Sequence, residues 1–166
     1  SSPFFLNSWL FKKATERLHD QHKFDVVICG TIHWMFDELP AFQGAKIVFD
    51  YRLRDKDEQI KSFKSDQVFS CKEIIFRVEE MKGADFALIK LDRPVPNRAF
   101  FKFSEAEATF QDQLLIVGYP LGLPLKFTFN GKVRSTLDIK YFVATVDTFS
   151  GNSGSPVLNQ ETFEIV

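Results

Sequence analysis

Ser153 lies in a segment, TFSGNSGSPV at residues 148–157, whose residue types suit acyl transfer. A serine hydroxyl is a weak nucleophile at neutral pH, so it needs a neighbouring base and hydrogen-bond donors directed at the developing oxyanion. Gly151 and Gly154 let the backbone turn tightly around the serine. The pattern predicts Ser153 as nucleophile and the amides of Gly151 and Ser153 as the oxyanion hole. The alternative is a plain surface turn, for which this composition is also typical.

The remaining candidates are an acid and a base. Asp85 lies at the head of the apolar run in GADFALIKL, residues 83–91, although a lone aspartate before a strand is usually a turn residue. His19 and His22 lie in the polar stretch RLHDQHKF and are expected to be solvated. His33 follows the apolar run FDVVIC and lies in GTIHWMFDEL, so it alone has the strand context that suits a general base. The alternative for His33 is a structural role.

These segments together resemble the trypsin-like (chymotrypsin-fold) serine peptidases. GNSGSPV is similar to their nucleophile loop, in the form of the bacterial glutamyl endopeptidases and HtrA-type proteases, and DFALIKL is similar to the segment of their histidine-orienting aspartate. The order also fits, since His33 precedes Asp85 by 52 positions and Asp85 precedes Ser153 by 68. The resemblance implies a serine endopeptidase in which His33 accepts the proton of Ser153 and Asp85 orients the imidazole.

Three positions refine the resemblance. The family usually has TAAH or TAGH at its histidine, whereas this chain has CGTIH around His33. Asn152 stands where digestive relatives carry an aspartate that pairs with a newly cut N-terminus, so we expect no activation by N-terminal cleavage. Asp147 stands where relatives that prefer Lys or Arg place the acid of the specificity pocket, although here it can simply end a strand. GYPLGLP at residues 118–124 resembles a second-barrel loop of bacterial relatives and is otherwise a rigid turn.

The pattern of short apolar segments predicts an all-β fold after one N-terminal helix at residues 8–18. The expected strands are residues 24–29, 46–51, 73–78, 86–91, 113–117, 125–129, 132–137 and 141–146. Asn130-Gly131 predicts a two-residue hairpin turn between two of them. The resemblance implies two six-stranded-type antiparallel β-barrels at residues 24–92 and 99–166, after a helical segment at residues 1–23. DRPVPNR at residues 92–98 would join the two barrels.

Composition fits one ordinary domain of 166 residues that is 45% hydrophobic. Lys plus Arg number 21 and Asp plus Glu 22, so charge implies neither nucleic acid nor an anionic membrane as partner. No run is long enough to span a membrane, and the start lacks a secretory signal, which favours a mature or trimmed chain. The 20 phenylalanines are expected to fill the core.

Cys29 and Cys71 either form one disulfide or remain free thiols. No metal site is expected, because closely spaced Cys and His ligands are missing from the sequence, and the implied mechanism needs no cofactor. The resemblance implies a protein or peptide substrate and favours a secreted or extracytoplasmic location. The oligomeric state stays open.

Only 13 residues follow Ser153, whereas the resembled fold needs several further strands there, of which ETFEIV would begin the first. The second barrel is therefore expected to be incomplete, and the chain to be a fragment or a relative too short for catalysis. Two alternatives to the peptidase stay open: a catalytically inactive binding or scaffold protein on the same fold, and a viral-type processing protease that cleaves its own termini.

Overall fold

The computed structural model describes residues 26–29, 45–79, 85–110, 112–136 and 142–166. The predicted helix at residues 8–18 lies outside this part of the chain, as do His19, His22 and His33. Among the described residues the fold is all-β, with a single short 3₁₀ turn, η2 at Pro120–Gly122. No helix in these ranges is long and apolar enough to cross a lipid bilayer.

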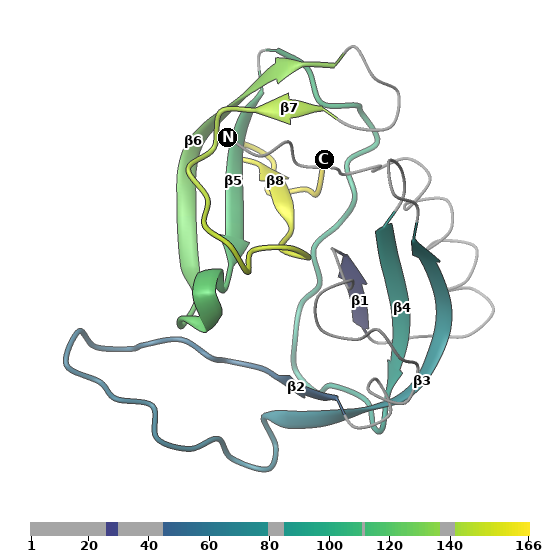
Figure 1. Ribbon diagram of the computed structural model, residues 1–166, viewed down its shortest axis with the longest axis vertical. Coiled ribbons are helices and arrows are strands. Elements are labelled where there is room, and N and C mark those ends of the chain that lie inside the picture. Colours follow the sequence, from purple (N-terminus) through teal and green to yellow (C-terminus); the bar gives the residue numbers. More distant parts are fainter. Residues whose placement is uncertain (1–25, 30–44, 80–84, 111, 137–141) are drawn as a thin grey trace.

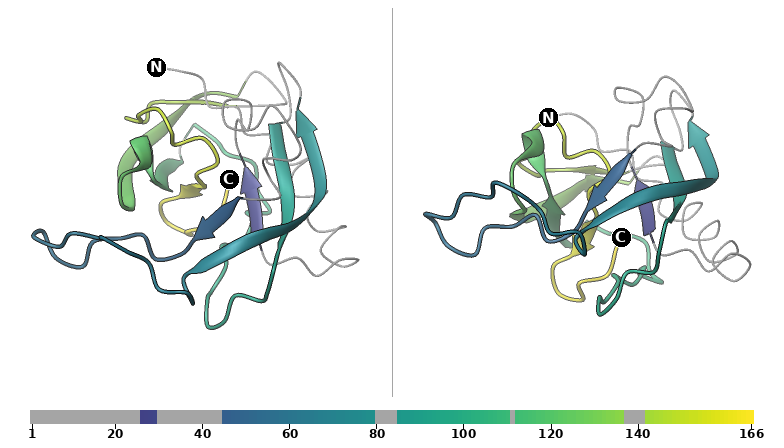
Figure 2. Two further views of the ribbon diagram at one scale, coloured as in Figure 1. Left: turned by 60° about the horizontal axis from the view of Figure 1, so that its bottom comes forward. Right: turned by 90° about the horizontal axis from the view of Figure 1, so that it is seen from below.

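The described strands form two four-stranded sheets in which all paired strands are antiparallel (Figure 1). The first sheet has the order β1-β4-β3-β2 and the second β7-β6-β5-β8. The strand bounds are β1 Val26–Cys29, β2 Lys46–Val48, β3 Val68–Glu79, β4 Asp85–Leu91, β5 Gln113–Gly118, β6 Lys126–Ser135, β7 Val143–Ala144 and β8 Val157–Asn159. Figure 2 shows the long β2–β3 connection extending away from the first sheet.

The first sheet packs around β4, whose Ala87, Leu88 and Ile89 are fully buried. A strand that is apolar on both faces belongs in the centre of a sheet, and β4 indeed pairs with β1 on one side and β3 on the other. Its core cluster consists of Phe69, Cys71, Ala87, Ile89 and Leu91. The prediction of a strand entering a core at residues 86–91 is therefore confirmed.

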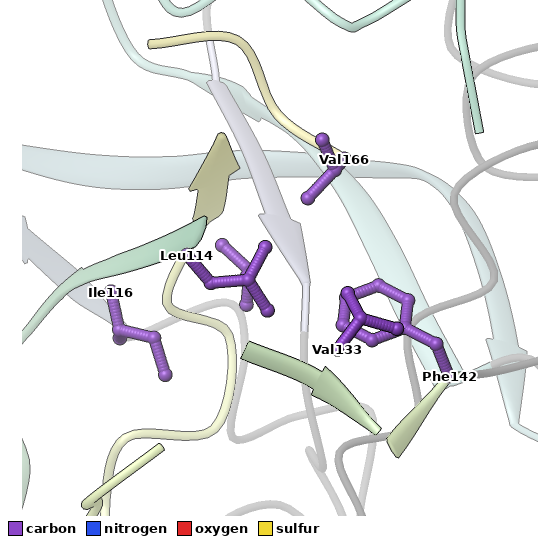
Figure 3. Packing of buried hydrophobic residues seen from close by; sticks show 6 residues of the cluster. Leu114, Ile116, Val133, Phe142 and Val166 are labelled. Atoms are coloured by element: carbon purple, nitrogen blue, oxygen red, sulfur yellow. The ribbon is translucent and has the colours of Figure 1, made fainter. Parts of the chain in front are cut away.

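The second sheet is centred on β5, which pairs with β6 on one side and β8 on the other. Its burial pattern places Leu114, Leu115 and Ile116 in the interior. Figure 3 shows the second core cluster, in which side chains from β5, β6 and the C-terminal residues meet. The cluster contains Leu114, Ile116, Val133, Phe142, Val157 and Val166.

The hairpin predicted at Asn130-Gly131 is wrong, because both residues lie inside the single continuous strand β6. A type I′ turn needs positive φ at both central positions. Asn130 meets this condition with a φ of 62°, but Gly131 does not have a positive φ. The register against β5 shifts between Leu114 and Ile116, which marks a β-bulge. Gly131 fits there because a Cβ would collide with Val146 Cγ2.

The ends of several strands also differ from prediction. β3 begins at Val68 instead of residue 73, because a register shift between Cys71 and Glu73 interrupts the alternation along the strand. β8 was not predicted. In the last segment, ETFEIV, Ile165 bridges Leu158 in an antiparallel sense and Phe103 in a parallel sense.

The expectation that the phenylalanines fill the core holds only in part. Phe69, Phe86 and Phe142 are buried. Nine others are at least 37% exposed: Phe63, Phe76, Phe100, Phe101, Phe110, Phe127, Phe129, Phe149 and Phe163. Aromatic content is thus a poor guide to burial in this chain, and its surface is rich in apolar rings.

The two cysteines do not form a disulfide. Cys71 is a free, buried thiol in the first core. The backbone explains why: Cys29 pairs with Phe86 on β4 and Cys71 pairs with Leu91. Five residues of strand separate these positions by roughly 16 Å along β4, far beyond the reach of a disulfide.

Candidate active site

The segment that carries Ser153 is the connection between β7 and β8, which we call the serine loop (residues 145–156). Both flanking strands belong to the second sheet, since β7 pairs with β6 and β8 pairs with β5. Figure 1 shows the loop running past one end of β5 and the η2 turn. The sheet therefore anchors both ends of the loop and leaves its middle on the surface.

Ser153 is exposed at the middle of this loop. The glycines on either side of it both have positive φ, 85° at Gly151 and 87° at Gly154, which side chains other than glycine rarely adopt. The Asn152 amide donates to Phe149 O at 3.4 Å and the Ser155 amide to Asn152 O at 3.0 Å. Within the described part of the chain, the amides of Gly151 and Ser153 donate to no backbone carbonyl. The amides of Asn152 and Ser155 are thus used inside the loop, whereas those of Gly151 and Ser153 have no described backbone acceptor.

The η2 turn supports the loop from outside. The Leu121 amide donates to Ser150 O at 2.8 Å. A Cβ added at Gly151 would lie 3.0 Å from Leu121 N, so this close approach requires glycine in addition to the positive φ. GYPLGLP at residues 118–124 was interpreted either as a family loop or as a rigid turn, and it forms a tight turn in which Leu121 has a φ of 55° and Gly122 of 71°.

A hydrogen-bond chain inside the serine loop, buried at Asn152 and Ser155, was not anticipated from the sequence. Asn152 Nδ2 donates to Thr148 Oγ1 at 3.0 Å, and Ser155 Oγ donates to Asn152 Oδ1 at 3.1 Å. Local side-chain bonding of this kind is common for Ser, Thr and Asn in turns. The sequence did contain a signal for these hydrogen bonds, because hydroxyl residues stand four positions before and three positions after the asparagine.

Of the other two predicted triad residues, the structure describes Asp85 but not His33. Asp85 is the first residue of β4 and pairs with Glu79 across the ladder with β3. His33 lies outside the described residues. The convergence of His33, Asp85 and Ser153 therefore stays a prediction. Asp147, the proposed specificity residue, is exposed at the start of the serine loop.

Two contacts connect the first sheet to the turn that supports the serine loop. Tyr51, just after β2, stacks on Tyr119 with ring centroids 6.0 Å apart and an interplanar angle of 11°. The Leu125 amide donates to Tyr51 O at 2.8 Å. Burial raises the pKa of the Tyr119 hydroxyl, and the negative charge of Asp50 adds to that shift. The segment that follows β2 is thus in direct contact with the turn beside the serine loop.

Acidic and cysteine side chains in the described residues form no group of three that could hold a metal ion. Near Ser153 the side chains of Thr148, Asn152 and Ser155 bond to one another, whereas the backbone amides of Gly151 and Ser153 donate to no described backbone carbonyl and can bind a substrate oxygen. The arrangement is therefore suited to an exposed nucleophile in a backbone-lined turn.

Comparison with solved structures gives distant matches. The Rv3671c protease in its inactive form aligns at 17% identity with a TM-score of 0.45, covering 62% of this chain and 55% of the other. The inactive form of a serine-to-alanine variant of Rv3671c from M. tuberculosis H37Rv aligns at 16% identity with a TM-score of 0.44, covering 61% and 52%. The chain spans about half the length of these structures. A search of curated proteins finds no significant match.

The sequence profile of the trypsin-like peptidase domain matches residues 44–166. This range contains Asp85, both sheets except β1, and the whole serine loop. The match covers about three quarters of the chain and includes the nucleophile segment on which the resemblance was based. The chain therefore belongs to the trypsin-like peptidase family.

Proposed function

We propose that this chain is the catalytic part of a serine endopeptidase that cleaves peptide bonds through an acyl-enzyme intermediate. Ser153 attacks the carbonyl carbon, His33 takes the hydroxyl proton and later gives it to the leaving amine, and Asp85 orients the imidazole. The amides of Gly151 and Ser153 stabilise the oxyanion. The reaction needs no cofactor, and its substrate is a protein or peptide. In this proposal residues 24–92 and 99–166 form the two barrels.

One observation carries the proposal. Ser153 is exposed between two positive-φ glycines, while the amides of Gly151 and Ser153 donate to no backbone carbonyl among the described residues. Unused donors beside an exposed hydroxyl can accept a developing negative charge without any rearrangement of the backbone. An ordinary turn also leaves amides in water, but it does not need a positive-φ glycine on each side of one serine.

A fluorophosphonate probe tests this directly, because it labels a serine only when the hydroxyl is activated. We expect the native chain to be labelled once and the Ser153→Ala variant to remain unlabelled. Ser150→Ala is the matched control: it makes the same change three residues earlier in the same loop, and only the Ser150 carbonyl has a described contact. Labelling of Ser153→Ala, or none of the native chain, would contradict the proposal.

The base and the acid are tested by the same reaction. His33→Ala should slow labelling by at least about a thousandfold, and Asp85→Asn by a similar factor, because the base is lost or held in the wrong tautomer. His19→Ala and His22→Ala are the matched controls and should label at the native rate. If a control histidine, and not His33, proves essential, the assignment of the base is wrong while the nucleophile stands.

We further propose that the protein belongs to the glutamyl-endopeptidase and HtrA-like branch, on the strength of GNSGSPV and the neutral Asn152. A neutral amide makes no ion pair with a freshly cut N-terminus. Removing a few leading residues should therefore leave the labelling rate unchanged. A large increase on trimming would place the protein among the enzymes activated in the manner of trypsin.

We propose that Asp147 makes only a small contribution to substrate specificity. Its carboxylate is exposed, and ion pairs in water contribute about 0–1 kcal/mol, so any preference for Lys or Arg at the cleaved residue should be less than about tenfold. A peptide library profiled with the native chain and with Asp147→Asn measures the preference. Equal profiles would remove Asp147 from the site.

A non-catalytic binding protein on the same fold is the second candidate. The atypical CGTIH sequence favours it, and so does the pair of exposed, stacked rings of Phe127 and Phe129, whose centroids lie 6.2 Å apart. Exposed aromatic groups are typical of binding surfaces. A native chain that folds but neither labels nor cleaves peptides would support this candidate.

A further inference from the structure

Asn152 and Ser155 are the two buried polar side chains in the described part of the chain, with 5% and 9% of their surfaces exposed. They lie on either side of Ser153, which is exposed. Burying a polar group without a partner destabilises a fold, so side chains of this kind are expected to be fully hydrogen-bonded. Their position beside the proposed nucleophile suggests that they serve the site.

Both ends of the Asn152 amide are used. Its nitrogen donates to Thr148 Oγ1 at 3.0 Å and its oxygen accepts from Ser155 Oγ at 3.1 Å. The Ser155 backbone amide also donates to Asn152 O at 3.0 Å. These three residues, which we call the asparagine clasp, connect the entry of the serine loop to its exit and enclose Ser153 between them.

The clasp fixes the direction of one of the two unused donors, the backbone N–H of Ser153. Gly151 and Ser153 are the immediate sequence neighbours of Asn152, and the peptide units on both sides of Asn152 are planar. Fixing the backbone of Asn152 therefore restricts the orientation of the Gly151–Asn152 and Asn152–Ser153 peptide planes. The N–H of Ser153 belongs to the second of these planes, so the clasp sets the direction in which that donor points.

The end of β5 supports the clasp from below. Gly118 is the last residue of β5, and a Cβ added there would collide with Ser155 Oγ and Asn152 Oδ1. Its φ is not positive, so glycine is required at this position by close approach and not by backbone conformation. The sheet therefore leaves space at residue 118 for the two buried side chains.

We propose that Asn152 is a positioning residue that, held by Thr148 and Ser155, keeps the Ser153 amide of the oxyanion hole in its reactive orientation. This inference rests on the function proposed for Ser153. The clasp is closed entirely by neutral groups of the loop itself, so it needs no charged partner from elsewhere in the chain. An amide is suited to this role, because it offers one donor group and one acceptor group to the two hydroxyls.

The test removes one hydrogen bond at a time without changing shape. Thr148→Val replaces the hydroxyl by a methyl group of similar size and leaves a buried amide hydrogen of Asn152 unpaired, whereas Thr148→Ser keeps the hydroxyl. Thr128→Val is the matched control, since Thr128 is also partly buried and its side chain has no described hydrogen bond. All three variants and the native chain are reacted with a fluorophosphonate over a range of probe concentrations.

We expect Thr148→Val to lower the limiting labelling rate about tenfold, the factor that corresponds to one unsatisfied buried hydrogen bond. The probe concentration that gives half the limiting rate and the fraction of labelled protein should both stay unchanged. Thr148→Ser should restore most of the rate. A loss confined to the labelled fraction, or a loss that Thr148→Ser does not restore, shows a merely structural role and overturns the proposal.

Hydrogen exchange separates failure of the clasp from failure of the proposed function. Thr148→Val should speed exchange of the Ser155 amide, whereas Thr128→Val should not. If the native chain does not label, the proposed function fails and the positioning role fails with it, but faster exchange still shows that the clasp orders the loop. If the native chain labels and Thr148→Val changes neither rate nor exchange, only the positioning proposal is overturned.

A second variant gives a pH signature. Asn152→Asp places a carboxyl group in the same buried position, where its protonated form can bond to both hydroxyls as the amide does. Asp147 and Tyr119 are the titratable side chains of the serine loop and of residues 118–124, and neither supplies a positive charge. Burial therefore raises the pKa of the introduced acid. The labelling rate relative to the native chain should fall as pH rises, and a ratio independent of pH contradicts the clasp.

Discussion

Arg98 forms a two-point ion pair with Asp50, from Nη1 to Oδ1 at 3.0 Å and from Nη2 to Oδ2 at 2.6 Å. Asp50 follows β2, whereas Arg98 ends the segment predicted to join the two barrels. The guanidinium also lies 4.9 Å from the centre of the Phe49 ring. The pair therefore attaches the connecting segment to the first sheet at a point next to Tyr51, which contacts the turn that supports the serine loop.

Arg98→Lys should destabilise the fold by about 1 kcal/mol, because lysine cannot reproduce the planar, two-point contact. The magnitude is small because both side chains keep about a third of their surface exposed, at 31% each. Arg134→Lys, an exposed position on β6, is the matched control and should be neutral. Denaturant unfolding measures both, and equal midpoints for Arg98→Lys and the native chain would contradict the expectation.

The same pair predicts a pH dependence. Hydrogen bonding to Arg98 lowers the pKa of Asp50 in the folded state below its ordinary value. A carboxyl group with a lowered folded pKa contributes stability that is fully present above its unfolded pKa, near pH 4, and is lost as pH falls through the folded value. The stability difference between the native chain and Arg98→Ala should therefore be constant above about pH 5 and shrink below about pH 4. A difference that grows on acidification would show that another group dominates.

Gly118→Ala should destabilise the fold by about 1–3 kcal/mol, the range for overpacking a well-packed interior. The new Cβ would meet Ser155 Oγ and Asn152 Oδ1. Gly122→Ala is the comparison, because its Cβ would meet nothing within 4 Å while its φ of 71° is unfavourable for alanine. We expect a loss of about 1 kcal/mol there from backbone strain alone.

The two glycine variants also differ in their effect on the site. Gly118→Ala disturbs the asparagine clasp and should slow fluorophosphonate labelling of the protein that remains folded. Gly122→Ala should slow labelling less, because its Cβ meets no atom of the serine loop. The reverse order of effects would mean that the η2 turn, and not the end of β5, controls the serine loop.

The central strands were predictable because burial leaves a clear pattern in sequence. β4 has continuous apolar residues, and its position between β1 and β3 explains that pattern. β3 was predicted too short because a bulge after Cys71 interrupts the alternation of apolar and polar residues. The period-two pattern can therefore be followed only on the C-terminal side of that bulge. Asn130-Gly131 was misread because asparagine and glycine serve bulges as readily as turns, and only the partner strand distinguishes the two.

The sequence predicted which residues form the candidate site, but it did not predict which of their side chains are in contact. Ser153 and its glycines stand out because exposed positive-φ backbone requires particular residues. The pairing of Asn152 with Thr148 and Ser155 depends on how the loop closes, which local sequence does not determine. The exposed phenylalanines were assigned to the core because hydrophobicity alone does not say which apolar residues a chain leaves on its surface.

Cys71 should be almost inert to thiol reagents in the native protein. Its side chain is 6% exposed, and burial raises the pKa of the thiol, so little reactive thiolate is present at neutral pH. A Cys29→Ser background isolates its signal. We expect a disulfide reagent to label Cys71 in the native protein at least about a thousandfold more slowly than in denaturant, because the reaction requires opening of the core. Rapid native labelling would show that the first core is open.

Tyr51 and Tyr119 should be energetically coupled. Their stacked rings connect the segment after β2 to the turn that supports the serine loop, and Phe63 packs edge-on against Tyr51 with centroids 5.4 Å apart. A double-mutant cycle of Tyr51→Phe, Tyr51→Ala and Tyr119→Ala isolates the contact. The interaction energy for the alanine pair should be about 0.5–1.5 kcal/mol, as for other aromatic pairs.

Tyr51→Phe keeps the ring and should retain the coupling, which separates stacking from any role of the hydroxyl. Tyr51→Ala combined with Phe129→Ala is the matched control pair, because these two rings have no described contact, so their effects should add. Leu121, two residues after Tyr119, holds the serine loop through the hydrogen bond from its amide to Ser150 O. Tyr119→Ala should therefore also slow labelling of Ser153, whereas Phe129→Ala should not. Additive tyrosine effects together with native labelling would mean that the first sheet does not help to hold the serine loop.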